Sequence, residues 1–135
     1  MPLTRTTAPG CVARTYLGMT SYIRAVRADL RGLLGDCPAL DDVVLCASEL
    51  ATNAVRHSRS GLRGGSFTLR VTVARGVSVR VDVQDDGGPW TPALAAPDRH
   101  HGLDIVGALA AELAITGDHR GRTVSAVLSW TPSLD

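Results

Sequence analysis

Two stretches of alternating apolar and polar residues, joined by a short turn, constrain the fold more than any other feature of this sequence. Apolar residues occupy every second position on both sides of Arg75-Gly76: Phe67, Leu69, Val71, Val73, then Val77, Val79, Val81 and Val83. A period of two places one set of side chains on one face of a strand, so the pattern predicts a hairpin with one apolar and one polar face. Other elements of the chain must cover the apolar face.

Helical periodicity lies before the hairpin. Apolar residues recur every three or four positions from about Cys11 to Leu34 and again from about Leu40 to His57. Asp41 and Asp42 stand in the first turn of the second helix, where the helix dipole favours acidic side chains. We expect residues 1–10 to be extended.

After the hairpin comes a loop rich in Gly and Pro, from Asp86 to about His101. A third helix is predicted from about Gly102 to Leu113, followed by a second hairpin made of residues 114–116 and 123–130 around a turn at 117–121. Helices and strands are largely segregated, which predicts the α+β class: a two-layer sandwich with helices on one face of the sheet.

The length and charge of the chain narrow its functions. Its 135 residues predict a single domain, residues 1–135 with a core at about 10–130. A net charge of +1 provides no long-range attraction to nucleic acid or acidic lipid, and no apolar run is long enough to span a membrane. We find no signal peptide and expect a cytoplasmic protein.

Residue usage excludes some chemistry. All fourteen basic residues are Arg, so neither a Walker-type phosphate loop nor a Schiff base, both of which need Lys, can form. Glu49 and Glu112 are the only glutamates. Three cysteines without a CxxC spacing predict reduced thiols rather than disulfides or a zinc site, and Cys46 is expected to be a small packing residue.

The second helix carries a polar row. Glu49, Asn53 and His57 are spaced four apart, so they line one side of the helix and border its apolar stripe. Such a row can form the floor of a pocket. The alternative is a solvated flank in which Glu49 is an ordinary surface acid.

The end of the first hairpin carries a carboxylate. The alternation that turns Val81 and Val83 inward also turns Asp85 inward, and Gly87-Gly88-Pro89 follows. A buried carboxylate needs donors, and an exocyclic amine such as that of adenine is one. The alternative is an Asp that caps the following turn.

The start of the third helix is a third candidate. Unpaired amides at a helix N-terminus suit phosphate, and Gly102 permits close approach at Gly102-Leu103. A simple helix start is the alternative. His100 and His101 are adjacent and face different ways, with no third ligand near them, which disfavours zinc.

Together these segments resemble the GHKL ATPases. The resemblance rests on four stretches of sequence: ELATNAVRHS from Glu49, DDGGP from Asp85, HGLDIV from His101 and GRTV from Gly121. It covers about residues 10–130 and is greatest to the small single-domain branch, the anti-sigma factor serine kinases, particularly actinobacterial members. It implies a Bergerat fold, with a mixed, mostly antiparallel sheet, that binds ATP and magnesium.

The resemblance also implies roles for residues. Asn53 would hold the magnesium ion, and Glu49 would orient or deprotonate the attacking group. Asp85 would accept from the adenine amine with Gly87 beside it, and Thr123 would support the adenine through Asp85 and a water. The backbone at Gly102 and Leu103 would meet the phosphates, and His57 occupies a position that is often His in this branch.

The chain departs from the family pattern around the lid, about residues 88–101. A single Gly102 follows His100 and His101, and Pro89 replaces a glycine common in relatives. Pro92 and Pro97 stiffen the lid further. Arg122, or Arg99 in the lid, could neutralise phosphate charge, although a solvated Arg is the alternative for each.

The function that we expect is therefore an ATP-dependent serine/threonine kinase of anti-sigma factor type. Its partner would be an antagonist protein or a sigma factor, and it could form a homodimer. One alternative is a non-catalytic partner-switch module in which ATP is structural or lost. Another is a detached histidine-kinase ATP domain, which the lack of a long coiled-coil-like helix upstream disfavours.

Overall fold

A computed structural model describes residues 4–8, 10–88 and 101–132 of the chain. Six strands form one sheet in the order β1-β2-β3-β4-β6-β5. The strands are β1 (Thr4–Ala8), β2 (Cys11–Leu17), β3 (Ser66–Ala74), β4 (Ser78–Asp85), β5 (Glu112–Asp118) and β6 (Gly121–Ser129). The helices are α1 (Ile23–Leu33), α2 (Leu40–His57) and α3 (His101–Leu109), with 3-10 turns η1 (Thr20–Tyr22) and η2 (Arg59–Gly61).

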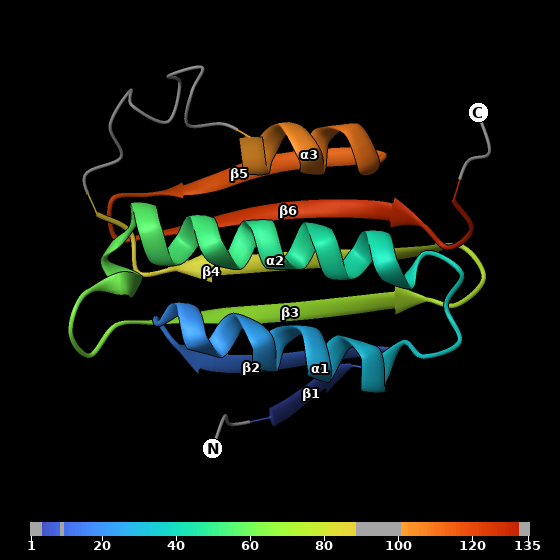
Figure 1. The fold of residues 1–135 in the computed structure, drawn as a ribbon, viewed down its shortest axis with the longest axis horizontal. Helices are drawn as coiled ribbons and strands as arrows, with labels where there is room; N and C mark the ends of the chain where they lie inside the picture. The colour runs from blue at the N-terminus through green and yellow to red at the C-terminus, as the bar shows by residue number, and fades with distance from the viewer. Residues whose placement is uncertain (1–3, 9, 89–100, 133–135) are drawn as a thin grey trace.

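The predicted α+β class is confirmed. All three α-helices lie on the same face of the sheet, which makes two layers (Figure 1). The sheet was expected to be mixed but mostly antiparallel, and every pair among the described strands is antiparallel. Tight hairpins join β3 to β4 and β5 to β6, and a hairpin can connect only antiparallel strands.

The first predicted helix is wrong over its first half. Residues 11–17 form β2, which pairs with β3 from Cys11 opposite Thr72 to Leu17 opposite Ser66. Val12 and Tyr16 are four residues apart, an even spacing that fits a strand face as well as a helix face. Met19, which seemed to continue the helical pattern, is 55% exposed.

The remaining elements follow the prediction with shifted ends. The second helix and the first hairpin form where expected, as α2, β3 and β4. The third helix ends at Leu109 rather than Leu113, because the amide of Ala111 already bonds to the carbonyl of Val127 in β6. The last turn consequently shrinks to His119-Arg120.

The core lies between the two layers. Aliphatic side chains dominate it and include Val26, Leu30, Val43, Leu50, Val81 and Val83. Each such side chain contributes about 1.5–3 kcal/mol when it is fully buried. Tyr16 stacks on Phe67 and donates a 2.6 Å hydrogen bond to Asp29 of α1, which anchors that helix to the sheet.

Two further sequence expectations concern the thiols and the membrane. Cys11, Cys37 and Cys46 are all buried, and none forms a disulfide in this structure. Cys46 is a packing residue of α2 with no exposed surface. Among the described residues, no helix is both long and apolar enough to cross a membrane.

Candidate functional site

Three element ends meet at one edge of the molecule. The C-terminal end of α2, the end of β4 and the beginning of α3 all lie on the left in Figure 1. These ends carry Asn53 and His57, Asp85 and Gly87, and Gly102 and Leu103, respectively. The fold thus brings the three sequence candidates to one edge, although they are up to fifty residues apart in the chain.

The polar row of α2 faces α3. Asp42 lines one cavity together with residues 108–111, which are the last two residues of α3 and the two that follow it. Because Glu49 and Asn53 follow Asp42 by seven and eleven residues, they lie on the same side of the helix. Glu49, Asn53 and His57 are all partly buried, which excludes a fully solvated flank.

Cys46 lies on α2 between Asp42 and Glu49. Burial, followed by the negative charges of Asp42 and Glu49, raises the pKa of its thiol to about 11. The effect of both carboxylates follows from helix geometry, because residues three and four apart on a helix are neighbours. Glu49 is at the centre of the row, between the acidic beginning of the helix and Asn53.

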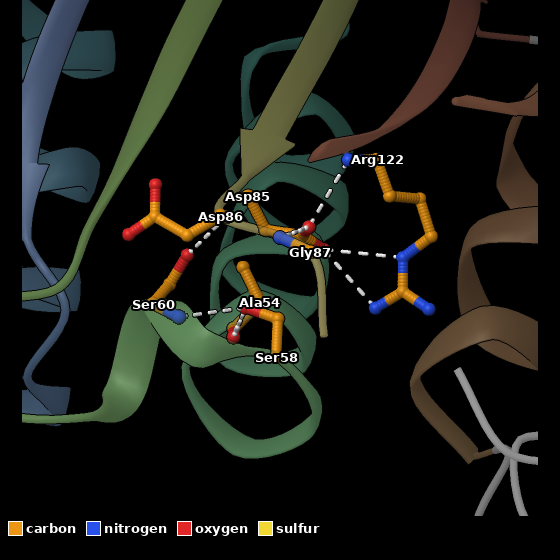
Figure 2. Close-up of polar contacts among 7 residues, drawn as sticks. All are labelled: Ala54, Ser58, Ser60, Asp85, Asp86, Gly87 and Arg122. Atoms are coloured by element: carbon orange, nitrogen blue, oxygen red, sulfur yellow. Dashed lines mark hydrogen bonds and ion pairs between the residues drawn. The ribbon is translucent and has the colours of Figure 1, made fainter. Parts of the chain in front are cut away.

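Asp85 is buried at the end of β4, as predicted, with an exposed fraction of 4%. Its Oδ1 accepts hydrogen bonds from the amides of Gly87, at 2.8 Å, and Arg122, at 3.2 Å. The bond from Gly87 is the turn cap that was the alternative role for this residue. Figure 2 shows that the same carboxylate also meets the side chain of Arg122.

The sequence did not reveal that Arg122 pairs with Asp85. Arg122 stands directly opposite Asp85 in the pairing of β4 with β6 and is only 3% exposed. Its Nε lies 3.1 Å and its Nη2 3.0 Å from Oδ2 of Asp85. The alternative of a solvated Arg is therefore wrong for this position. Arg99 lies outside the described residues.

Thr123 does not reach Asp85. It pairs with Gln84 and follows Arg122, so strand alternation turns it to the sheet face without helices. The inward positions of β6 are Arg122, Val124 and Ala126, all buried. The support that the resemblance assigned to Thr123 must be corrected for this reason, and the nearest inward side chain is that of Arg122.

Gly87 is required by the packing of the chain. Its φ of +74° is in the region that side-chain-bearing residues rarely adopt. A Cβ atom there would overlap the backbone of His119 and Arg120 in the β5–β6 turn. The bare side of Gly87 therefore faces this turn, and the amide of Gly88 bonds to the carbonyl of His119 at 2.8 Å.

A chain of serines fixes the end of α2 against the end of β4 (Figure 2). The Ser58 hydroxyl donates to the carbonyl of Ala54 at 2.6 Å and accepts from the amide of Ser60. The fully buried Ser60 then accepts from the amide of Asp86 at 2.9 Å. These bonds hold Asp85 in a fixed position relative to the last turn of α2.

The beginning of α3 is less fully described. Gly102 lies in the first turn of the helix, and the partly buried Leu103 packs against the core. Residues 89–100, with most of the lid and His100, lie outside the described residues. Among the residues that are described, no three His, Cys, Asp or Glu side chains form a metal cluster.

The α2 end of the site suits magnesium and the phosphates of a nucleotide. The Asp85 end could bind the base only after its present partners rearrange. The amide oxygen of Asn53 is a hard oxygen ligand of the kind that magnesium takes, together with waters and phosphates. Asp85 is a buried acceptor for a base, but three hydrogen bonds and an ion-pair contact with Nη2 of Arg122 already occupy its two oxygens.

An antiparallel sheet covered on one face by helices, with a buried Asp beside an Asn-bearing helix, defines the Bergerat class of ATP-binding domain. The chain belongs to the histidine kinase-like ATPase domain family, whose family model matches residues 18–128. The predicted superfamily is thereby confirmed, and membership implies ATP binding. None of the curated proteins compared with the chain matches it.

Two solved structures are similar. The structure of the RsbU and RsbW domains of Rv1364c from Mycobacterium tuberculosis aligns with a TM-score of 0.63 and 25% identity. A histidine kinase domain from an Erythrobacter litoralis blue-light activated histidine kinase aligns with a TM-score of 0.50 and 23% identity, which shows the fold alone. This chain is covered to 86% and 81%, but it spans only 32% and 59% of those chains.

Proposed function

We propose that this protein binds magnesium-ATP where α2, β4 and α3 meet, and transfers the terminal phosphoryl group to a serine or threonine of a partner protein. Family membership supports the nucleotide. The observation that carries the kinase proposal is the partly buried row of Glu49 and Asn53, which faces α3 beside the buried Asp85. A base and a magnesium ligand then stand four residues apart on one rigid helix.

Each residue has a role in this proposal. The side-chain oxygen of Asn53 binds magnesium, and Asp85 takes the adenine amine. Backbone amides of Gly102 and Leu103 in the first turn of α3 meet the phosphates, helped by the helix dipole. His57, one turn beyond Asn53, borders the phosphate end of the site. Gly87 keeps the turn after Asp85 close to the β5–β6 turn.

Bound magnesium-ATP supplies an activated phosphoryl group. Glu49 accepts the proton of the partner's hydroxyl as its oxygen forms a bond to the terminal phosphorus, and the bond from that phosphorus to the bridging oxygen breaks to release ADP. Phosphoryl transfer depends mainly on positioning and charge neutralisation, which side chains on a helix can provide without Lys. Glu49 is the only glutamate of the site, since Glu112 is exposed on β5.

The partner is proposed from the resemblance and from the RsbW domain of the Mycobacterium tuberculosis structure. We propose an antagonist protein of anti-sigma type, or a sigma factor, as the partner in transcriptional regulation within the cytoplasm. A homodimer is part of the same proposal.

One observation favours a second function. Asp85 is already fully engaged by Arg122 and two amides. A partner-switch module that binds its target without catalysis could tolerate such a closed base site, because it would use ATP only for shape or not at all.

Phosphotransfer with labelled ATP and a candidate antagonist protein separates the two functions. For the kinase, Glu49→Gln lowers transfer by about a hundredfold or more, since removal of a general base costs this much. Glu112→Gln is the matched control because it removes the only other glutamate from an exposed strand. Transfer that persists in Glu49→Gln contradicts the role of Glu49. ATP binding without any transfer supports the module.

A further inference from the structure

The two oxygens of Asp85 have different partners. Oδ1 accepts from two backbone amides, those of Gly87 and Arg122. Oδ2 is approached by two side-chain nitrogens of Arg122, at 3.1 and 3.0 Å. The backbone bonds are independent of the Arg122 side chain, so they would hold the carboxylate in place if the guanidinium moved away.

Both oxygens of this carboxylate are occupied: three nitrogens hydrogen-bond to them, and Nη2 of Arg122 lies 3.0 Å from Oδ2 as an ion pair. An ionised Asp offers about four lone-pair sites on two oxygens. These four nitrogens surround Asp85, and both residues of the pair are less than a twentieth exposed. An adenine amine could therefore bond to Asp85 only if a donor leaves, and only the guanidinium can leave without unfolding the turn.

We infer that Arg122 is a specificity-determining residue that occupies the base-binding carboxylate, so that adenine binds only in exchange for the guanidinium. This rests on the proposed nucleotide site. Arg122 is suited to the role because its long side chain projects from the second residue of β6, next to the turn. The exchange replaces charge-assisted bonds with one bond from a neutral amine, which weakens ATP binding.

The direct test is the ATP affinity of Arg122→Met, measured by calorimetry. This variant keeps the bulk of an apolar stem but has no donor. We expect its affinity to rise by about tenfold or more, because bonds to a charged group no longer have to be broken. Arg120→Met is the matched control: it removes the same charge from an exposed position two residues earlier and should leave the affinity unchanged.

Comparison of ATP with inosine triphosphate tests whether Asp85 binds the exocyclic amine of the base. Inosine triphosphate carries a carbonyl oxygen in place of the exocyclic amine and so cannot donate to Asp85. We expect Arg122→Met to prefer ATP over inosine triphosphate by about tenfold more than the wild type does. Equal affinities and equal preferences in the two proteins would overturn the inference while leaving the nucleotide site intact. Weaker ATP binding in Arg122→Met would also overturn it, because Arg122 would then support the base.

A second measurement covers the case in which Arg122→Met does not fold. The Nε–H of Arg122 in the wild-type protein can be followed by nitrogen-15 NMR, where its buried ion pair should protect it from exchange with water. Saturating ATP should abolish this protection, and inosine triphosphate should not. Protection that persists with ATP bound overturns the inference. If neither nucleotide binds either protein, the proposed function fails and the inference fails with it.

Discussion

At the scale of single residues, Asp85 shows how one carboxylate can serve both fold and site. Its Oδ1 closes the turn at Gly87, whereas its Oδ2 pairs with Arg122. A buried ion pair of this kind is costly to break by removal of one partner, since the other charge is left without compensation. The Arg122 guanidinium could leave Asp85 at a lower cost when a ligand donates to the carboxylate in its place.

Cys46 permits a residue-scale prediction about pH. Burial, then Asp42 and Glu49, raise its pKa from 9.0 to about 11, so the folded protein holds the thiol proton more tightly than the unfolded chain does. Titration of Cys46 therefore leaves the free energy of unfolding unchanged below pH 9. It lowers that free energy by roughly 1–3 kcal/mol between pH 9 and 11. Burial and the hydrogen bond to Asp29 also raise the pKa of Tyr16, so its titration lowers the free energy of unfolding further at higher pH.

Urea unfolding of the wild type and Cys46→Ala across this pH range measures the effect. The variant should lose less stability as pH rises, because Ala does not titrate. A parallel decline in the two proteins would show that Cys46 does not titrate in this window.

Single residues also show the limit of the sequence. Strand alternation predicted the inward direction of Asp85 correctly, because it depends only on neighbours in one strand. The partner of Asp85 depends on the register of β6 against β4, which places Arg122 opposite it. An Arg is by default assigned to solvent, so its burial could not be foreseen from composition. The outward direction of Thr123 follows from the alternation of Val124, Ala126 and Leu128, but our expectation followed the family resemblance instead.

At the scale of elements, close contacts between turns define the site. The turn after β4 and the β5–β6 turn touch at Gly87, and the loop after α2 is tied to the end of β4 through Ser60. A shift of either turn would move Asp85 relative to Asn53.

Gly87→Ala should destabilise the protein more than Gly76→Ala. Both glycines have positive φ, +74° and +81°, so both substitutions cost about 1–2 kcal/mol in backbone strain. Only at Gly87 does the added Cβ overlap backbone, which adds about 1–3 kcal/mol, whereas nothing lies within 4 Å at Gly76. Urea unfolding compares the two, and equal losses would show that the contact of the turns is loose.

Helices and strands were predictable where the apolar residues followed only one period, either the two-residue period of a strand or the three- to four-residue period of a helix. The hairpin of β3 and β4 has strict alternation over two runs, and α2 has a continuous apolar stripe, so both were placed correctly. In β2 the four-residue spacing of Val12 and Tyr16 fits both periods, and only its pairing with β3 settles it as a strand. Such long-range pairing leaves little trace in local sequence.

At the scale of the whole molecule, the helices cover one face of the sheet. The ends of α2 and β4 and the beginning of α3 lie at one edge of the molecule (Figure 1). This arrangement converts a row on α2 and a residue at a strand end into two walls of one site. Family membership agrees with it over residues 18–128.

Calorimetric titration with magnesium-ATP tests the central claim most directly, that α2 and β4 together form a nucleotide site. The wild type should bind in the micromolar range, and Asn53→Ala should lose the dependence on magnesium and about tenfold or more in affinity, because a ligand to the metal is gone. Arg56→Ala, an exposed neighbour on the same helix, should bind as the wild type does. Absence of heat with the wild type at high protein concentration, or equal binding by Asn53→Ala, would contradict the account.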